Sequence, residues 1–186
     1  MKKIILSTFF ILFYFALVTT TSASENADQE LEKILQTGEI IYMDDEITVR
    51  SFKNDPEISN AIFNHPNSAV SDISNEYSIV PFSSATGPGG RSSIVASDTG
   101  RTVYWSVKPA TAWPYSFSGL VKLRYHSGFK RDAPIGGMGA LGSTVSGAVS
   151  MNKNNGGVAY LTGTAFALNN IYYKVLPGVS TSYRPN

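Results

Sequence analysis

The sequence predicts a mainly β protein, an antiparallel β-sandwich or small barrel over about residues 77–186, preceded by a short helical N-terminal segment. After residue 77, apolar and polar residues alternate with a period of two in short runs, as in half-buried strands. The runs are rich in β-branched and aromatic residues, and glycine, proline and asparagine separate them, as expected for strands joined by turns. At least seven such runs favour a sandwich or a small barrel.

Residues 1–23 have the order of a secretory signal peptide. Lys2 and Lys3 precede an apolar and hydroxyl run over residues 4–18, and small residues follow up to Ser24, which predicts cleavage near that residue. The alternative is a retained anchor, although a membrane-spanning helix needs about 20 apolar residues. We therefore expect a secreted protein that is extracellular or associated with the cell surface.

The sequence contains no cysteine. Disulfides, thiolate metal sites and cysteine nucleophiles are therefore excluded, and stability must come from the packed core. An exported chain without cysteine fits a bacterial origin better than an oxidising secretory pathway.

Residues 24–76 are expected to form an acidic helical leader and a linker before the β domain of residues 77–186. Residues 25–62 contain ten acids and three bases, a net charge of −7, whereas residues 63–186 contain ten bases and four acids, a net charge of +6. Such a leader can be a solvated helix, a cover for the basic part of the chain or a pro-segment that is later removed.

Two short helices are expected in the leader. Residues 26–38 place acids in the first turns, a small apolar stripe after them and a glycine at the end. Residues 55–63 begin with Asp55 as the cap and Pro56 at the first helical position. Residues 47–52 alternate like a strand, and residues 64–76 are polar and turn-rich, like a linker.

Two segments have the clearest strand pattern, and both are predicted to be half-buried. Residues 102–108 place Val103, Trp105 and Val107 on one face and mostly polar residues on the other. Residues 119–126 place three apolar side chains inward and Lys122, Arg124 and His126 outward. Further strands are expected at residues 77–82, 92–97, 144–151, 157–168 and 171–176.

A hydroxyl residue followed by glycine recurs near the start of three strand candidates. The pairs are Ser118-Gly119, Ser146-Gly147 and Thr162-Gly163, and their spacings differ. A repeat architecture has a fixed period, so convergent strand chemistry is the better interpretation. Each glycine predicts a bend, a bulge or a point of close packing.

Known catalytic patterns find little support, so we expect no catalytic residue, no metal and no cofactor. The two histidines, His65 and His126, lie far apart in unrelated contexts and form no zinc pattern. Two Ser-x-x-Lys matches, at residues 127–130 and 150–153, have no companion motif. Asp98 and Asp132 are the only acids well inside the β region, whereas a glycosidase needs two carboxylates that face each other.

Binding features are better represented than catalytic ones. Five potentially cationic side chains could converge on one surface, and these are Lys122, Arg124, His126, Lys130 and Arg131. Trp113 and Tyr115 form an aromatic loop of the kind that stacks on sugar rings. The alternatives are an ordinary solvated strand face and a turn that buries its rings. We hypothesise a secreted, non-catalytic protein that binds an anionic polymer of the cell wall or extracellular space, or an acidic membrane surface.

A second hypothesis rests on residues 134–150, which are glycine-rich, weakly apolar and free of charge. Such a segment could insert into a membrane as a hairpin, as in a toxin or a bacteriocin-like protein. The alternative is a flexible glycine loop that leads into a buried strand from Thr144. No specific nucleic-acid motif is present, and nothing in the sequence indicates a protein partner.

Overall fold

The computed structural model of this chain describes residues 29, 31, 33–65, 83–175 and 179–184. The signal peptide expected at residues 1–23, most of the expected linker and the strand expected at residues 77–82 lie outside the described residues.

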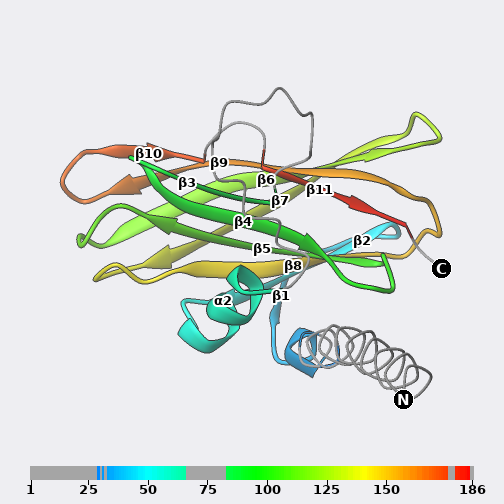
Figure 1. Cartoon of the computed structure of the whole chain (residues 1–186), viewed down its shortest axis with the longest axis horizontal. Coiled ribbons are helices and arrows are strands. Elements are labelled where there is room, and N and C mark those ends of the chain that lie inside the picture. The colour runs from blue at the N-terminus through cyan, green and yellow to red at the C-terminus, as the bar shows by residue number, and fades with distance from the viewer. Residues whose placement is uncertain (1–28, 30, 32, 66–82, 176–178, 185–186) are drawn as a thin grey trace, which may run out of the picture.

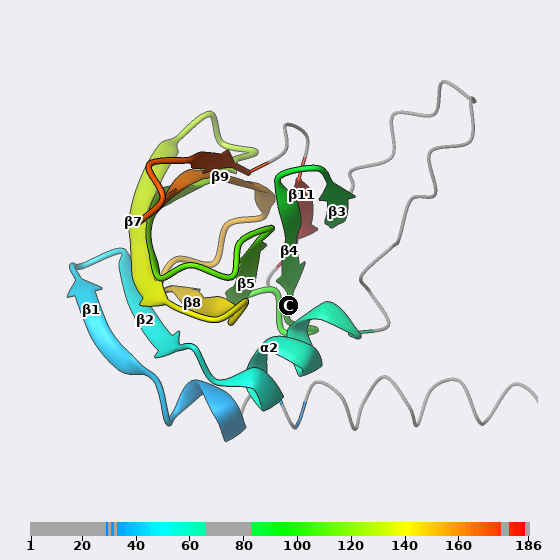
Figure 2. The ribbon, with the colours of Figure 1, turned by 90° about the vertical axis from the view of Figure 1, so that its left-hand side faces the viewer.

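The strands form two antiparallel sheets (Figure 1). Across the six-stranded sheet lie, in order, β1 (Glu39–Met43), β2 (Ile47–Lys53), β8 (Val145–Met151), β5 (Thr102–Pro109), β4 (Gly90–Ala96) and β3 (Ser84–Gly87). Across the five-stranded sheet lie β10 (Tyr172–Lys174), β9 (Gly157–Ala167), β6 (Tyr115–Tyr125) and β7 (Lys130–Gly139), and β11 (Ser180–Tyr183) also pairs with β9. Figure 2 shows the two sheets facing each other around a shared interior. The mainly β, antiparallel prediction is confirmed, and the described strands do not close into a barrel.

The strand connections gather at the two ends of the molecule (Figure 1). One end carries the turns at residues 44–46, 97–101, 126–129 and 152–156, and we call it the charged end. The opposite end carries the loops at residues 110–114, 140–144 and 168–171, and we call it the loop end. Long antiparallel strands thus separate the two groups of loops.

Inward side chains of both sheets form the main core. The six-stranded sheet contributes, among others, Ile47, Val49, Ile94, Val103, Trp105 and Val149. The five-stranded sheet contributes Phe117, Val121, Leu123, Ile135 and Leu161. The ring centres of Trp105 and Phe117 lie 5.8 Å apart, so the two sheets meet through aromatic contacts as well as aliphatic ones.

Strand β5 is buried on both faces, so the prediction of a half-buried strand is wrong for it. Tyr104 points away from the main core, yet it is fully buried in a second cluster with Leu31 and Ile62. Its hydroxyl donates to the Leu31 carbonyl at 3.0 Å. The N-terminal helices therefore cover the outer face of the six-stranded sheet, as Figure 2 shows for α2 (Pro56–Phe63).

The N-terminal segment is only partly helical. Helix α2 begins as predicted: the Asp55 carboxylate accepts from the backbone N–H groups of Glu57 and Ile58, at 2.9 and 3.2 Å. Between the helices, the strand predicted at residues 47–52 is confirmed as β2, which forms a hairpin with β1 and pairs with β8 from Ile47 to Lys53. Part of the expected leader is thus built into the six-stranded sheet.

The glycine-rich residues 134–150 form neither one flexible loop nor a separate hairpin. Strand β7 pairs with β6 along its whole length as far as Gly139, and β8 begins at Val145. Only residues 140–144 between them form a loop. The small residues allow close packing: a Cβ at Gly137 would lie 2.5 Å from a Val145 methyl carbon.

The recurring glycines mark points of close packing, as one of the interpretations predicted. Gly119 and Gly163 pair with each other across β6 and β9, and a Cβ at Gly163 would lie 2.6 Å from the Phe117 ring. A Cβ at Gly147 would lie 2.7 Å from the Trp105 ring and 2.4 Å from the Arg50 carbonyl oxygen. The two core aromatic rings therefore lie directly over glycine backbone.

Gly147→Ala is therefore expected to lower the free energy of unfolding by about 2 kcal/mol or more, because the new methyl group must displace both a ring and a neighbouring strand. Urea denaturation followed by circular dichroism measures this loss. Gly89→Ala is the matched control, since its Cβ would meet no atom nearer than the Lys174 carbonyl oxygen at 3.4 Å. Equal losses in both variants would contradict the packing argument.

Candidate functional site

The outward side chains of β7, β6 and β9 form an ordered grid. Residues that lie opposite each other in an antiparallel sheet share a face, and the registers of the three strands are continuous. From the charged end to the loop end, the rows are Lys130–Arg124–Val158, Asp132–Lys122–Tyr160, Pro134–Leu120–Thr162, Gly136–Ser118–Thr164 and Met138–Ser116–Phe166. We call these fifteen residues the outer face.

The cations of the outer face gather in its two rows nearest the charged end. Lys130 lies opposite Arg124, and Lys122 lies opposite Asp132 and Tyr160. The Arg124 guanidinium forms an ion pair with Asp132 at 2.7 Å and also donates to the Arg131 carbonyl at 3.2 Å. These two rows, which we call the cationic quadrant, contain three cations and one carboxylate and so have a net positive charge. Among the described residues, neither lysine has a carboxylate within ion-pair distance.

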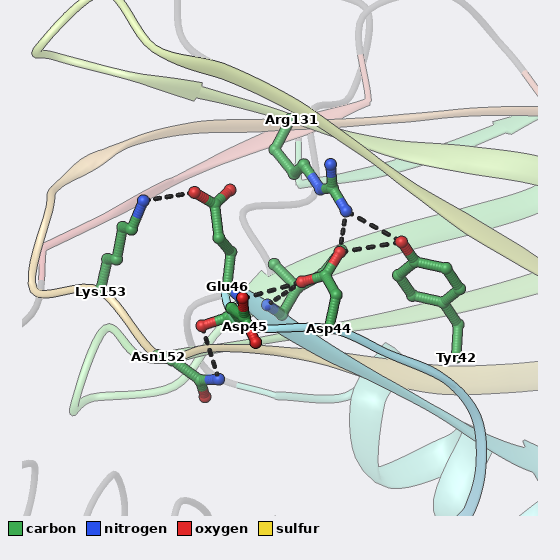
Figure 3. A network of polar contacts seen from close by, with 8 residues as sticks. Tyr42, Asp44, Asp45, Glu46, Arg131, Asn152 and Lys153 are labelled. Atoms are coloured by element: carbon green, nitrogen blue, oxygen red, sulfur yellow. Dashed lines mark hydrogen bonds and ion pairs between the residues drawn. The ribbon is translucent and has the colours of Figure 1, made fainter.

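Arg131 does not join the other cations. It pairs with Leu123, whose side chain points into the core, so it lies on the opposite face of β7 from Lys130. Its guanidinium donates to the Tyr42 hydroxyl at 2.9 Å and forms an ion pair with Asp44 (Figure 3). Arg131 thus links β7 of one sheet to the β1–β2 hairpin of the other. The five cations predicted to converge are divided between two faces.

The acidic turn at residues 44–46 is held by contacts on several sides (Figure 3). One carboxylate oxygen of Asp44 accepts from the backbone N–H groups of Glu46 and Ile47, at 2.8 and 2.9 Å. The other accepts from the Tyr42 hydroxyl at 2.8 Å and meets Arg131. Lys153 pairs with Glu46 across the turn. The turn is therefore fixed by side-chain contacts, and of its three acids only Asp45 is exposed.

The remaining predicted site residues lie in different places. His126 is exposed and directly follows β6 at the charged end, where its backbone N–H donates to the Gly156 carbonyl at 2.9 Å. Trp113 is 57% exposed in the 110–114 loop, at the loop end. The aromatic loop and the cations are thus separated by the length of β6.

Tyr115 is buried, with 2% of its surface exposed. Its hydroxyl donates to the Ser143 carbonyl at 2.9 Å, and burial raises the pKa of the phenol to about 12. The phenol therefore stays protonated at physiological pH and holds the 140–144 loop against β6. Of the predicted aromatic pair, only Trp113 offers its ring to solvent.

Neither a metal site nor a membrane-spanning helix is found in the described part of the chain. No three His, Asp or Glu side chains gather there in a metal-binding group. No helix there is long and apolar enough to cross a membrane. Compared with models of known protein families and with curated proteins, the sequence matches none of them.

The outer face also includes residues that were not predicted from the sequence to bind a ligand. Tyr160 is 41% exposed beside Lys122, and the hydroxyl residues Ser118, Thr162 and Thr164 occupy the middle rows. A signal was present in the sequence, because a strand was expected at residues 157–168 and every second residue of a strand points to the same face. What was missing was the register that places them beside Lys122.

Proposed function

We propose that this protein is a secreted, non-catalytic binding protein that holds an anionic polymer of the cell surface on its outer face. The observation that supports this proposal best is the positive quadrant formed by Lys122, Arg124 and Lys130 at one end of that face. Cations on adjacent strands, at the spacing of a sheet, suit a chain of repeated phosphate or carboxylate groups.

The rest of the outer face suits an extended ligand better than a compact one. Beyond the cations, Tyr160 offers an exposed ring for contact with an apolar or sugar surface. The middle rows offer hydroxyl groups, which can donate and accept hydrogen bonds. Side chains that stand in straight rows on a pleated sheet match a linear polymer laid along or across the strands.

The two sheets differ in how far their outer faces are available. The N-terminal helices cover that of the six-stranded sheet, where Tyr104 and Ser106 are fully buried. No described helix packs on the outer face of the five-stranded sheet (Figure 2), and its Tyr160, Met138 and Lys130 are exposed. A ligand can therefore reach this face without any rearrangement of the described elements.

The proposal predicts that Lys122→Glu/Lys130→Glu reduces retention on isolated bacterial cell walls by about tenfold or more, because the quadrant changes sign. Co-sedimentation with walls that keep or lack their teichoic acid, at low and high salt, measures this. Retention of the unaltered protein should need the anionic polymer and fall with added salt, because salt screens exposed charges. Arg124 is left unchanged so that its ion pair with Asp132 stays intact.

The matched control is Lys33→Glu/Arg101→Glu, which makes the same change in net charge at two exposed positions away from the outer face. It should reduce retention much less than the outer-face variant. Equal losses in the two variants would show that only net charge matters, and unchanged retention in the outer-face variant would rule out this surface.

A further inference from the structure

The loop end exposes an unusual number of large apolar side chains. Trp113, Leu141, Leu168 and Ile171 lie in its three loops with 57%, 87%, 69% and 48% of their surfaces exposed. The last row of the outer face continues this surface with Met138 and Phe166, and Tyr172 lies opposite Phe166 on β10. A soluble monomer rarely exposes apolar groups together in this way unless they have a function.

The three loops are joined into one unit by backbone hydrogen bonds. The Leu168 N–H donates to the Pro114 carbonyl at 2.9 Å, and the Leu141 N–H donates to the Ala112 carbonyl at 3.2 Å. The hydroxyl of Tyr115, in β6, also holds the 140–144 loop by donating to the Ser143 carbonyl. The three loops that carry the four apolar side chains are therefore held together at one end of the molecule (Figure 1).

The loops themselves are uncharged, and the strands that lead into them carry lysines at this end. Residues 110–114, 140–144 and 168–171 contain no charged side chain at all. The charged residues of the strands that lead into them are, at this end, Lys108 of β5 and Lys174 of β10, and both are exposed. Of the acids on the side of the six-stranded sheet, Glu39 is paired with Lys53 at 3.1 Å and Asp55 caps α2, whereas Glu57 in the first turn of α2 is exposed.

We propose that the loop end docks on an anionic lipid surface, with Trp113, Leu141, Leu168 and Ile171 entering the interfacial layer and Lys108 and Lys174 contacting lipid headgroups. The site is distinct from the cationic quadrant of the outer face and lies at the opposite end of β6. It implies shallow, reversible association, since only loop tips are apolar and the strands behind them belong to a packed sandwich.

Lipid fits this surface better than a protein partner does. The apolar side chains protrude from loop tips, whereas a protein interface centres on a packed patch with pockets. Tryptophan and tyrosine favour the membrane interface, where one part of the ring is apolar and another is wet. A lysine behind an apolar tip can keep its ammonium group at the headgroups while its stem contacts apolar surface. Lys108 and Lys174, both exposed, complement anionic headgroups.

The two tryptophans make the proposal directly measurable. Trp105 is fully buried, whereas Trp113 is exposed, so a change in emission on adding lipid reports the loop end. The chain is expressed from residue 24, because the apolar residues 4–18 would bind lipid themselves, and no described contact is lost. With vesicles of equimolar phosphatidylcholine and phosphatidylglycerol, we expect a blue shift and quenching by brominated lipid.

Leu141→Asp/Leu168→Asp should weaken vesicle binding by about tenfold or more, because two charges would have to enter the interface. Both positions are highly exposed, so the fold should persist, and an unchanged circular dichroism spectrum checks this. The matched control, Ile40→Asp/Met43→Asp, places the same charges at exposed apolar positions on β1 and should bind normally. Lys108→Glu/Lys174→Glu should weaken binding to the mixed vesicles far more than to pure phosphatidylcholine.

Two results would overturn this inference. One is the absence of any shift or quenching with both vesicle types. The other is a dimer in sedimentation velocity without lipid that dissociates in the Leu141→Asp/Leu168→Asp variant. The apolar loop tips would then mediate self-association. The Lys122→Glu/Lys130→Glu protein should still show Trp113 quenching, so failure of the polymer site and failure of the lipid site can be told apart.

Discussion

Trp105→Ala should lower the free energy of unfolding by about 3–5 kcal/mol, the largest loss that we expect from one substitution. The side chain is fully buried between the two sheets and contacts Phe117 and the backbone at Gly147. The indole ring lies where a side chain at Gly147 would begin, and a small domain is held together by a margin of about 5–15 kcal/mol. Urea denaturation followed by far-ultraviolet circular dichroism measures the loss without relying on tryptophan emission.

Trp105→Phe is the control for this prediction. A phenyl ring still covers Gly147 and reaches Phe117, so the loss should be well below that of the alanine variant. A loss below about 1 kcal/mol in Trp105→Ala would mean that the two sheets can collapse onto the vacated space, and the glycines would then not define a rigid contact.

The strands that the sequence predicted well are those with one buried face and bulky inward side chains. In β6, Val121, Leu123 and Tyr125 are buried, and they alternate with Lys122 and Arg124, as expected. The period of two is visible there because apolar bulk and charge differ strongly between neighbours. The same contrast gave the direction of both cationic side chains correctly.

Strand β7 escaped prediction because its inward and outward positions look alike. Ala133 and Ile135 point inward, but the glycines that follow carry no side chain to mark a face. Without this strand, Lys130 and Arg131 were both expected on one cationic surface. Adjacent residues of a strand point to opposite faces, so recognising the strand would have separated the two cations and removed Arg131 from the binding surface.

Other differences depend on contacts between residues that are distant in the chain. Tyr104 was expected to face solvent, but it is covered by Leu31, far earlier in the sequence. The alternation of apolar and polar residues within one strand cannot show that its outer face is covered, because the covering residues come from another segment. The loop end has the same origin: Trp113, Leu141 and Leu168 come from three loops that only the antiparallel topology brings together.

The two proposed surfaces lie at opposite ends of the molecule and so predict how it is oriented at a cell surface. The cationic quadrant lies toward the charged end, and the apolar tips lie at the loop end, with the length of β6 between them. If the loop end docks on a lipid surface, the strands of the outer face run away from that surface. The outer face then stays accessible to a polymer that extends from the same cell. The two tests with charge and apolar variants address the two surfaces independently.

Asp44→Ala should lower the free energy of unfolding by about 2–3 kcal/mol, although Asp44 lies in a turn rather than in the core. The substitution removes the acceptor for two backbone N–H groups and for the Tyr42 hydroxyl. It also leaves Arg131, which is only 31% exposed, without its carboxylate partner. Urea denaturation measures the loss.

Asp45→Ala provides the matched control, because it removes an equal charge from the same turn at an exposed side chain, and it should change stability by less than about 0.5 kcal/mol. Asp44→Asn should fall between the two, since an amide oxygen can still accept from the backbone N–H groups but carries no charge for Arg131. In a double-mutant cycle, Arg131→Met should cost less in the Asp44→Ala protein than in the unaltered one. Additive losses would instead show that the two residues stabilise the fold separately, and that Arg131 does not fasten β7 to the β1–β2 hairpin.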